Sequence, residues 1–210
     1  MKTPTLWWCC CWAGLLALPT LVSAETETIV CFRHGERTKA ELGQLTVQGL
    51  NRALALPAVL SAHFGTPQFL FAPDPARNLI SDGKPGSGHY DYVRPLATIE
   101  PTAVKFGLPV STNFGYHEID KLEAELLLPQ YHSALVFVAW EHAWEARFVT
   151  KIVADLGGAP NQVPPWASSD FDSFYIVRIE RSGGKTTVSF SLDHEGLDGM
   201  SDQFPTPPKP

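Results

Sequence analysis

The sequence predicts an α/β protein, specifically a three-layer α/β/α sandwich with a largely parallel central sheet and an antiparallel edge hairpin. Short apolar runs of strand length alternate with segments of helical spacing along most of the chain, which is typical of parallel sheets covered by helices. Two runs, residues 29–32 and 134–140, contain no polar residue, as expected for strands buried on both faces. Near the C-terminus, Gly183-Gly184 between two further strand segments predicts the hairpin.

The elements between these runs can be placed in order. Thr46 is expected to cap a helix whose apolar residues, from Val47 to Leu60, lie at roughly helical spacing, and Pro57 is expected to kink or divide it. Further strands are expected at residues 68–72, 110–114, 174–179 and 186–190. Further helices are expected at residues 94–106, with Pro95 in the first turn and Gly107 at the end, at 121–128 before Pro129, and at 143–156 before Gly157-Gly158.

Residues 1–24 have the pattern of a secretory signal peptide. Lys2 precedes an apolar core at residues 6–18, and small residues at positions 22–24 form the exit. The apolar run is too short for a membrane anchor, and a polar segment follows it. The mature protein is therefore expected to begin at Glu25 and to be exported, periplasmic or secreted, with no membrane span after signal removal.

Residues 25–204 are expected to form a single domain, followed by a proline-rich tail at residues 205–210 that does not pack. Of the four cysteines only Cys31 lies outside the signal peptide, so no intramolecular disulfide is expected, and Cys31 is interpreted as a small buried hydrophobe. Without Lys2 the chain has 15 basic and 22 acidic side chains, a net charge of −7. This charge argues against a nucleic-acid partner but permits a small anionic substrate at a site where basic residues are concentrated.

The predicted strand at residues 29–32 ends directly in Arg33-His34-Gly35-Glu36-Arg37. Open α/β sheets place their ligand sites at the carboxyl ends of strands, and Gly35 lets the backbone turn sharply there. Guanidinium groups match phosphate oxygens in pairs, while a neutral imidazole nitrogen can attack phosphorus. The alternative is a solvated loop in which His34 makes only a structural hydrogen bond.

A second histidine follows the second buried strand. His142 comes directly after Glu141, which follows the run at residues 134–140. Because the carboxyl ends of parallel strands meet at one edge of a sheet, His34 and His142 are expected to lie close together.

Four motifs in this order resemble those of the histidine phosphatase superfamily, also called phosphoglycerate mutase-like. They are Arg33-His34-Gly35, Leu45-Thr46-x-x-Gly49, Arg94-x-x-x-Thr98 at the start of a helix, and His142 after an apolar strand. The resemblance extends from about residue 29 to about residue 157.

The resemblance implies a role for each matching residue. His34 would be the nucleophile that becomes phosphorylated, Arg33 and Arg94 would clamp the phosphate, and His142 would stabilise the transferring group from the opposite side. Arg37 would be a further phosphate-binding residue, as in the acid-phosphatase branch. No metal and no cofactor is expected, because three arginines and two histidines around one phosphate suffice for phosphoryl transfer.

The sequence departs from the acid-phosphatase branch at two positions. That branch expects proline where this chain has Lys39 and an aspartate, the general acid, where it has Ala143. In the mutase-like branch the acid is a glutamate on the loop before the last catalytic strand, and Glu118 fits that place. Glu118 could equally be an ordinary surface carboxylate, and Asp74 and Glu141 are the next candidates for the acid.

Two functions of different class follow. The first is an exported, metal-independent phosphatase that hydrolyses a small phosphomonoester through a phosphohistidine; the second is a catalytically inactive protein that binds a phosphorylated ligand on the same fold. A mutase is a weaker alternative. Residues 76–92 are expected to be an insertion near the phosphate pocket or a passive surface loop, and the contacts that the insertion would offer are His89, Tyr90 and Tyr92. Four further residues show no metal-ligand spacing: His63, His132, Asp193 and His194.

Overall fold

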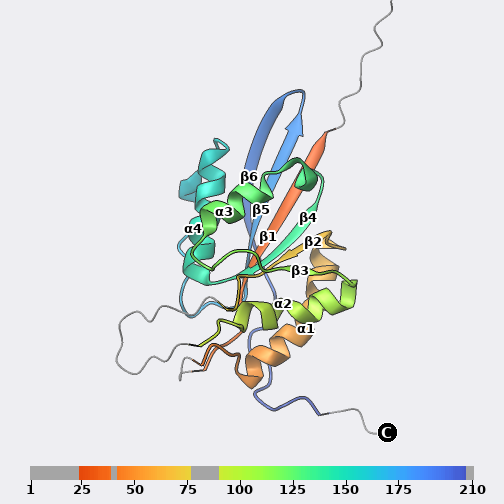
Figure 1. Ribbon diagram of the computed structural model, residues 1–210, viewed down its shortest axis with the longest axis vertical. Helices are drawn as coiled ribbons and strands as arrows, with labels where there is room; N and C mark the ends of the chain where they lie inside the picture. Colours follow the sequence, from red (N-terminus) through yellow and green to blue (C-terminus); the bar gives the residue numbers. More distant parts are fainter. Residues whose placement is uncertain (1–23, 39–41, 77–89, 207–210) are drawn as a thin grey trace, which may run out of the picture.

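The structure is a computed structural model that describes residues 24–38, 42–76 and 90–206 (Figure 1). The strands are β1 (Glu25–Arg33), β2 (Phe69–Phe71), β3 (Val110–Ser111), β4 (Leu135–Trp140), β5 (Ser173–Ser182) and β6 (Lys185–His194). The helices are α1 (Val47–Phe64), α2 (Arg94–Phe106), α3 (Ile119–Leu126) and α4 (His142–Asp155). Short 3₁₀ turns lie at Pro129–Tyr131 and Pro160–Gln162.

The strands form one six-stranded sheet in the order β3-β2-β4-β1-β5-β6. The first four strands of that order pair in parallel, while β5 runs antiparallel to β1 and β6 runs antiparallel to β5. The predicted fold class, a largely parallel sheet with an antiparallel hairpin at its edge, is confirmed.

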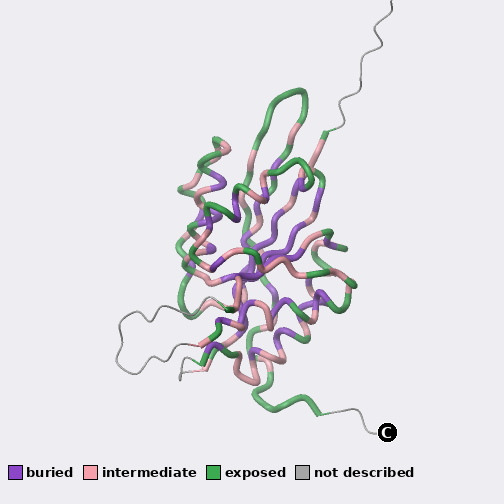
Figure 2. Tube along the Cα trace, in the orientation of Figure 1, coloured by how far each residue is buried: buried purple, intermediate pink, exposed green. Residues whose placement is uncertain are grey.

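Helices cover both faces of the sheet, so the central strands are buried, as Figure 2 shows along β1 and β4. Successive side chains of β1 point to opposite faces. Cys31 belongs to the core that includes residues of α3 and α4, whereas Phe32 belongs to the core that includes residues of α1 and α2. This arrangement explains why the run at residues 29–32 has no polar member. It also confirms that Cys31 is buried.

The expected division of the first helix at Pro57 is wrong, because α1 continues through Pro57 to Phe64. The alternative, a kink at Pro57, stays a prediction. The helix begins as predicted, with the Gly49 N–H donating to the Thr46 hydroxyl at 3.1 Å. A proline removes one donor from the helix ladder, but α1 also buries Leu56 and Leu60. Packing of this apolar face, rather than local propensity, therefore maintains the helix.

The hairpin is confirmed, although each of its strands has ten residues and is longer than expected. Gly183 and Gly184 form a two-residue turn with φ of 57° and 76°, values that favour glycine. Ser182 pairs with Lys185 directly across the turn. Within the parts of the chain that the structure describes, no helix is both long and apolar enough to cross a membrane.

Candidate active site

The predicted site lies where the carboxyl ends of β1 and β4 meet (Figure 1). His34 follows β1, and its backbone N–H donates to the Trp140 carbonyl oxygen at 3.1 Å, which extends the ladder between the two strands. Arg33 is in register with Trp140, so the chain leaves the sheet at His34 and at Glu141 side by side. The two strand ends that carry His34 and His142 therefore meet, as the sequence predicted.

The imidazole of His34 is buried, with 1% of the residue exposed. Its Nδ1 lies 2.7 Å from the Gly35 carbonyl oxygen, and because a carbonyl oxygen can only accept, Nδ1 carries the hydrogen and Nε2 keeps its lone pair. Burial lowers the pKa of His34 well below its usual value, and the positive charges of Arg94 and Arg33 lower it further. At neutral pH the ring is uncharged, with Nε2 in the form that can attack phosphorus.

The loop after β1 is fixed by close backbone packing against the start of α1. A Cβ atom on Gly35 would lie 2.8 Å from the Gly49 carbonyl oxygen, and one on Gly49 would lie 2.5 Å from the Glu36 carbonyl oxygen. The Gly35 N–H donates to the Thr98 hydroxyl at 3.0 Å, and that hydroxyl donates to the Arg94 carbonyl oxygen at 2.8 Å. Both glycine positions and Thr98 therefore position the loop that carries His34.

Arg33 is buried beside His34, with 2% of the residue exposed. Its Nη1 donates to the carbonyl oxygens of Ser168 and Asp170 at 2.8 and 2.9 Å, and its guanidinium carbon lies 3.7 Å from the centre of the Phe171 ring. Burial lowers the pKa of Arg33 to about 10, so the side chain remains charged at neutral pH. Neutral groups thus hold Arg33 in place without cancelling its charge.

Arg94 approaches His34 from the start of α2 and is also buried. Its guanidinium carbon lies 4.8 Å from the centre of the Tyr92 ring, and that ring contacts His34 edge to face at 5.9 Å between ring centres. Burial raises the pKa of Tyr92, so its phenol remains protonated. Tyr92 therefore contacts both the predicted nucleophile, His34, and one of the predicted phosphate ligands, Arg94.

Tyr92 was predicted as a contact offered by the insertion at residues 76–92, and its side chain is fully buried in the site. Its backbone N–H donates to the Pro75 carbonyl oxygen at 2.8 Å, so the two ends of the insertion meet beside the site. Tyr90 is partly buried, and residues 77–89, including His89, lie outside the described residues. The effect of the insertion on substrate choice stays a prediction.

His142 is the first residue of α4, and it follows the end of β4, the strand that pairs in parallel with β1. Nδ1 of His142 lies 2.6 Å from Oε1 of Glu141. The other carboxylate oxygen of Glu141, Oε2, accepts hydrogen bonds from the backbone N–H groups of Ala143 and Trp144 at 3.0 Å each. Glu141 is therefore the N-cap of α4 as well as a neighbour of His142. The sequence analysis gave Glu141 no such role, although an acidic residue before a predicted helix is a capping signal.

No family profile and no curated protein matches the chain. Among solved structures, it is similar to a protein from Nakamurella multipartitia provisionally named phosphohistidine phosphatase SixA, with a TM-score of 0.50 and 14% identity over 80% of this chain and 96% of that one. The chain has the histidine phosphatase fold. The predicted resemblance is therefore confirmed at the level of the fold.

Two other structures are similar at lower scores. A mycobacterial glucosyl-3-phosphoglycerate phosphatase in complex with inorganic phosphate has a TM-score of 0.49 and 15% identity over 80% of this chain and 95% of that one. A SixA protein from Agrobacterium tumefaciens, also provisionally named as a phosphohistidine phosphatase, has a TM-score of 0.46 and 12% identity over 79% of this chain and 97% of that one.

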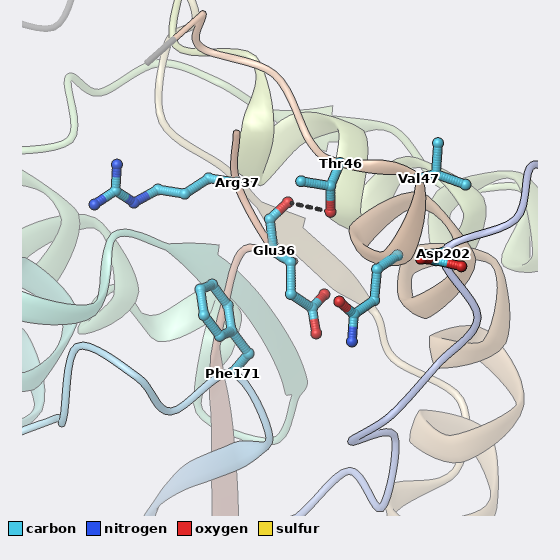
Figure 3. Close-up of a pocket in the computed structure, with 7 residues that line it drawn as sticks. Glu36, Arg37, Thr46, Val47, Phe171 and Asp202 are labelled. Carbon is cyan, nitrogen blue, oxygen red and sulfur yellow. Dashed lines mark hydrogen bonds between the residues drawn. The ribbon is translucent and has the colours of Figure 1, made fainter. Parts of the chain in front are cut away.

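Arg37 lies at the rim of this histidine phosphatase-like site and is exposed. Its charge acts on Arg33, and Figure 3 shows its side chain pointing away from Glu36 and Thr46. It borders an open hollow of about 450 Å³ whose other lining residues are Glu36, Thr46, Val47, Gln48, Phe171 and Asp202. Because the centre of the Phe171 ring also lies 6.2 Å from the centre of the His34 ring, the hollow adjoins the predicted nucleophile.

Glu118 lies on the loop before α3, where the sequence predicted it. Oε2 accepts the Gly115 N–H at 2.8 Å, and Oε1 lies 2.6 Å from Nζ of Lys121. The contacts found among the described residues tie this carboxylate to the start of α3 rather than to His34 or His142. Its role as the general acid stays a prediction.

Two of the other histidines singled out in the sequence, His63 and His132, form pairs with carboxylates near the surface. Nδ1 of His63 lies 2.9 Å from Asp193, and Nδ1 of His132 lies 3.1 Å from Glu25. In the described part of the chain, no group of three or more His, Cys, Asp or Glu side chains is placed to hold a metal ion. Burial raises the pKa of Cys31 well above its usual value, which makes this thiol a poor nucleophile.

Proposed function

We propose that this protein is a phosphatase that hydrolyses a small phosphomonoester through a covalent phosphohistidine at His34, without a metal ion. The observation that carries the proposal is the state of His34, a buried neutral imidazole with Nε2 unprotonated. Arg33 and Arg94 place positive charge beside it. The provisional name of the SixA protein from Nakamurella multipartitia, a phosphohistidine phosphatase, supports a phosphatase activity in general.

The reaction would proceed in two displacements. Nε2 of His34 forms a bond to phosphorus while the bond to the leaving oxygen breaks, and Arg33, Arg94 and His142 offset the charge on the equatorial oxygens. Water then attacks phosphorus, the bond from phosphorus to Nε2 breaks, and its electron pair returns to the ring. Arg37 would attract the anionic substrate from the rim.

The leaving oxygen must also receive a proton. Glu118 is the acid that the resemblance implies, and as such it would matter most for poor leaving groups. Replacement by glutamine would then slow hydrolysis of β-glycerophosphate by about 10²-fold and that of p-nitrophenyl phosphate much less. Equal effects on both substrates, or none, would exclude Glu118 as the acid.

We also propose that residues 1–24 are a signal peptide and that the mature protein, periplasmic or secreted, begins at Glu25. The start of β1 at Glu25 supports this boundary, because cleavage there would leave the sheet complete. Intact-mass measurement of the exported protein checks the boundary. A mass that retains residues 1–24 would refute it.

The decisive activity test uses residues 25–210, purified, with p-nitrophenyl phosphate in the presence and absence of a chelator. The proposal expects turnover that the chelator does not change. His34→Ala should remove it, while His63→Ala, a matched change in a surface histidine pair, should not. The alternative, an inactive protein that binds a phosphorylated ligand, expects phosphate binding and no turnover by the unmodified protein.

A further inference from the structure

Glu141 is a carboxylate held at both oxygens beside His142. Oε2 accepts two backbone N–H groups at 3.0 Å each, and Oε1 lies 2.6 Å from Nδ1 of His142. Only 17% of the Glu141 side chain is exposed, against 20% for His142. The carboxylate is therefore fixed next to the ring rather than free in solvent.

This carboxylate is ionised at neutral pH. Burial alone would raise the pKa of Glu141, but the contact with His142, the N–H of Trp144 and the charge of Arg33 together lower it below its usual value. Nδ1 of His142 and Oε1 of Glu141 are 2.6 Å apart, and a lone pair on each atom would repel the other. Nδ1 must therefore carry a hydrogen, and Nε2 is the nitrogen that remains available to the substrate. Nδ1 has no aligned hydrogen-bond partner, so Glu141 acts on His142 mainly through charge.

Other titratable groups surround the pair from four elements. They are Arg33 and His34 at the end of β1, Tyr92 and Arg94 at the start of α2, Tyr116 before α3, and Glu145 on α4. Burial raises the pKa of Tyr92, Tyr116 and Glu145 and lowers that of His34, so these four groups are neutral at neutral pH. Of the groups named, only Arg33 and Arg94 are charged, and both are positive. Glu141 is thus the ionised carboxylate next to His142, and within the described residues its charge acts on Arg33 without a direct salt bridge.

We propose that Glu141 is the positioning residue of an acid–base pair in which His142 protonates the leaving group. The inference rests on the phosphohistidine mechanism proposed above. It assigns the proton transfer to a group at the end of β4, the strand that pairs with β1 beside His34, whereas the two oxygens of Glu118 contact Gly115 and Lys121. It also gives a source for the proton in a chain with alanine after its second histidine.

The proton balance closes over both displacements. In the first, Nε2–H of charged His142 gives its proton to the leaving oxygen as the phosphorus–oxygen bond breaks, and His142 becomes neutral. In the second, neutral His142 takes a proton from the attacking water as the phosphorus–nitrogen bond at His34 breaks. The products are the alcohol and phosphate, and both histidines return to their starting forms.

The test compares Glu141→Gln, Glu141→Asp, Glu118→Gln and Glu180→Gln with the unmodified protein, using pH profiles of kcat/KM. Glu180 is the matched control, since it is exposed and paired with Arg178 on β5. The substrates are p-nitrophenyl phosphate, which has a good leaving group, and β-glycerophosphate, which has a poor one. Thermal unfolding of each variant identifies any loss of fold, and Glu141→Asp keeps the charge should Glu141→Gln not fold.

Glu141→Gln should slow β-glycerophosphate by about 10²-fold and p-nitrophenyl phosphate by less than about 10-fold. An acid works in its protonated form, so activity falls as pH rises, and loss of the neighbouring anion should move this alkaline limb of the pH profile to lower pH. Glu141→Asp should recover part of both effects, and Glu180→Gln should show neither. A role in capping α4 alone would change stability without moving the limb.

The inference would be overturned if Glu141→Gln lost activity equally on both substrates and its alkaline limb did not move. It would also be overturned if Glu118→Gln, but not Glu141→Gln, lost activity selectively on β-glycerophosphate. The proposed function is tested separately by trapping the phosphoenzyme formed from p-nitrophenyl phosphate. Phosphoenzyme at His34 together with an unmoved limb rejects only the role of Glu141. Absence of phosphoenzyme in the unmodified protein rejects both proposals.

Discussion

Two buried arginines near the same loop have opposite surroundings. Arg52 on α1 is fully buried and faces four carboxylates at 2.6 to 3.2 Å, those of Glu36, Asp172, Glu195 and Asp198. Burial opposes the charge of Arg52, but the contacts with Glu36 and Glu195 raise its pKa above the usual value. Its charge is therefore used within the protein, where it joins the loop after β1 to the segments that flank the hairpin.

Arg33 is nearly as buried, yet carbonyl oxygens and an aromatic ring hold it. Within the described residues, no carboxylate forms a salt bridge with Arg33. Burial without a paired anion lowers its pKa to about 10, the opposite direction from Arg52. The comparison teaches that residue type alone does not identify a candidate phosphate ligand. A buried guanidinium that forms no salt bridge with a carboxylate is the stronger candidate.

The largest effect is expected on stability at Arg52. Arg52→Met would leave the buried carboxylate of Glu195 without its partner, and breaking a buried ion pair in this way costs about 3–5 kcal/mol. Arg178→Met is the matched control, because it removes an exposed pair and should change stability by less than about 1 kcal/mol. Denaturant unfolding of both variants measures the difference, and similar values would contradict the structural role of Arg52.

At Arg33 we expect a large loss of activity and little loss of stability. Arg33→Met should lower kcat/KM by about 10²- to 10³-fold, the range found when one donor to a developing negative charge is removed. Its free energy of unfolding should stay within about 1 kcal/mol of that of the unmodified protein, because no paired carboxylate is left behind. A variant that unfolds as easily as Arg52→Met but keeps its activity would show that the two arginines have the same role.

The smallest effect concerns Glu145, which would become an ion partner of Arg33 if it were charged. The carboxyl is fully buried, its oxygens have no hydrogen-bond partner, and burial raises its pKa well above 4.5. Because the pKa of Glu145 is raised in the folded state, this group contributes stability that is fully present below about pH 4.5. The contribution is lost as the pH rises towards the pKa of Glu145 in the folded protein.

Glu145→Gln removes this titration. Between pH 4.5 and the folded-state pKa of Glu145, the free energy of unfolding of the variant should therefore rise relative to that of the unmodified protein, by up to about 1.4 kcal/mol for each pH unit. Denaturant unfolding at several pH values measures the difference. A gain that does not depend on pH would mean that Glu145 is already ionised and partly cancels the charge of Arg33.

The sequence was informative where a candidate site residue comes directly after a buried strand. The uninterrupted run at residues 29–32 indicates burial on both faces, so the position of His34 at the carboxyl edge followed from the pattern. His142 could be placed beside it for the same reason. These predictions needed only the parallel pairing of β1 with β4, which the alternation of elements implies.

The sequence was uninformative where the site depends on contacts between distant segments. Arg33 is held by Ser168 and Asp170, which are 135 and 137 residues away, and no local pattern encodes such contacts. Tyr92 was predicted as a contact offered by a loop, but no local pattern indicated that its ring is buried against His34. Pro57 was expected to kink or divide the first helix, and the helix is not divided because tertiary packing maintains it.

The most direct test is the identity of the residue that carries phosphate during turnover. Labelled substrate, quenched without acid within the first turnover, should give a phosphoenzyme that is labile in acid, stable in base and attached to His34. His34→Ala should fold normally, give no phosphoenzyme and lose essentially all activity, since its neighbours Arg33 and Arg94 remain but the nucleophile does not. Label at another residue, or substantial turnover by His34→Ala, would contradict the mechanism.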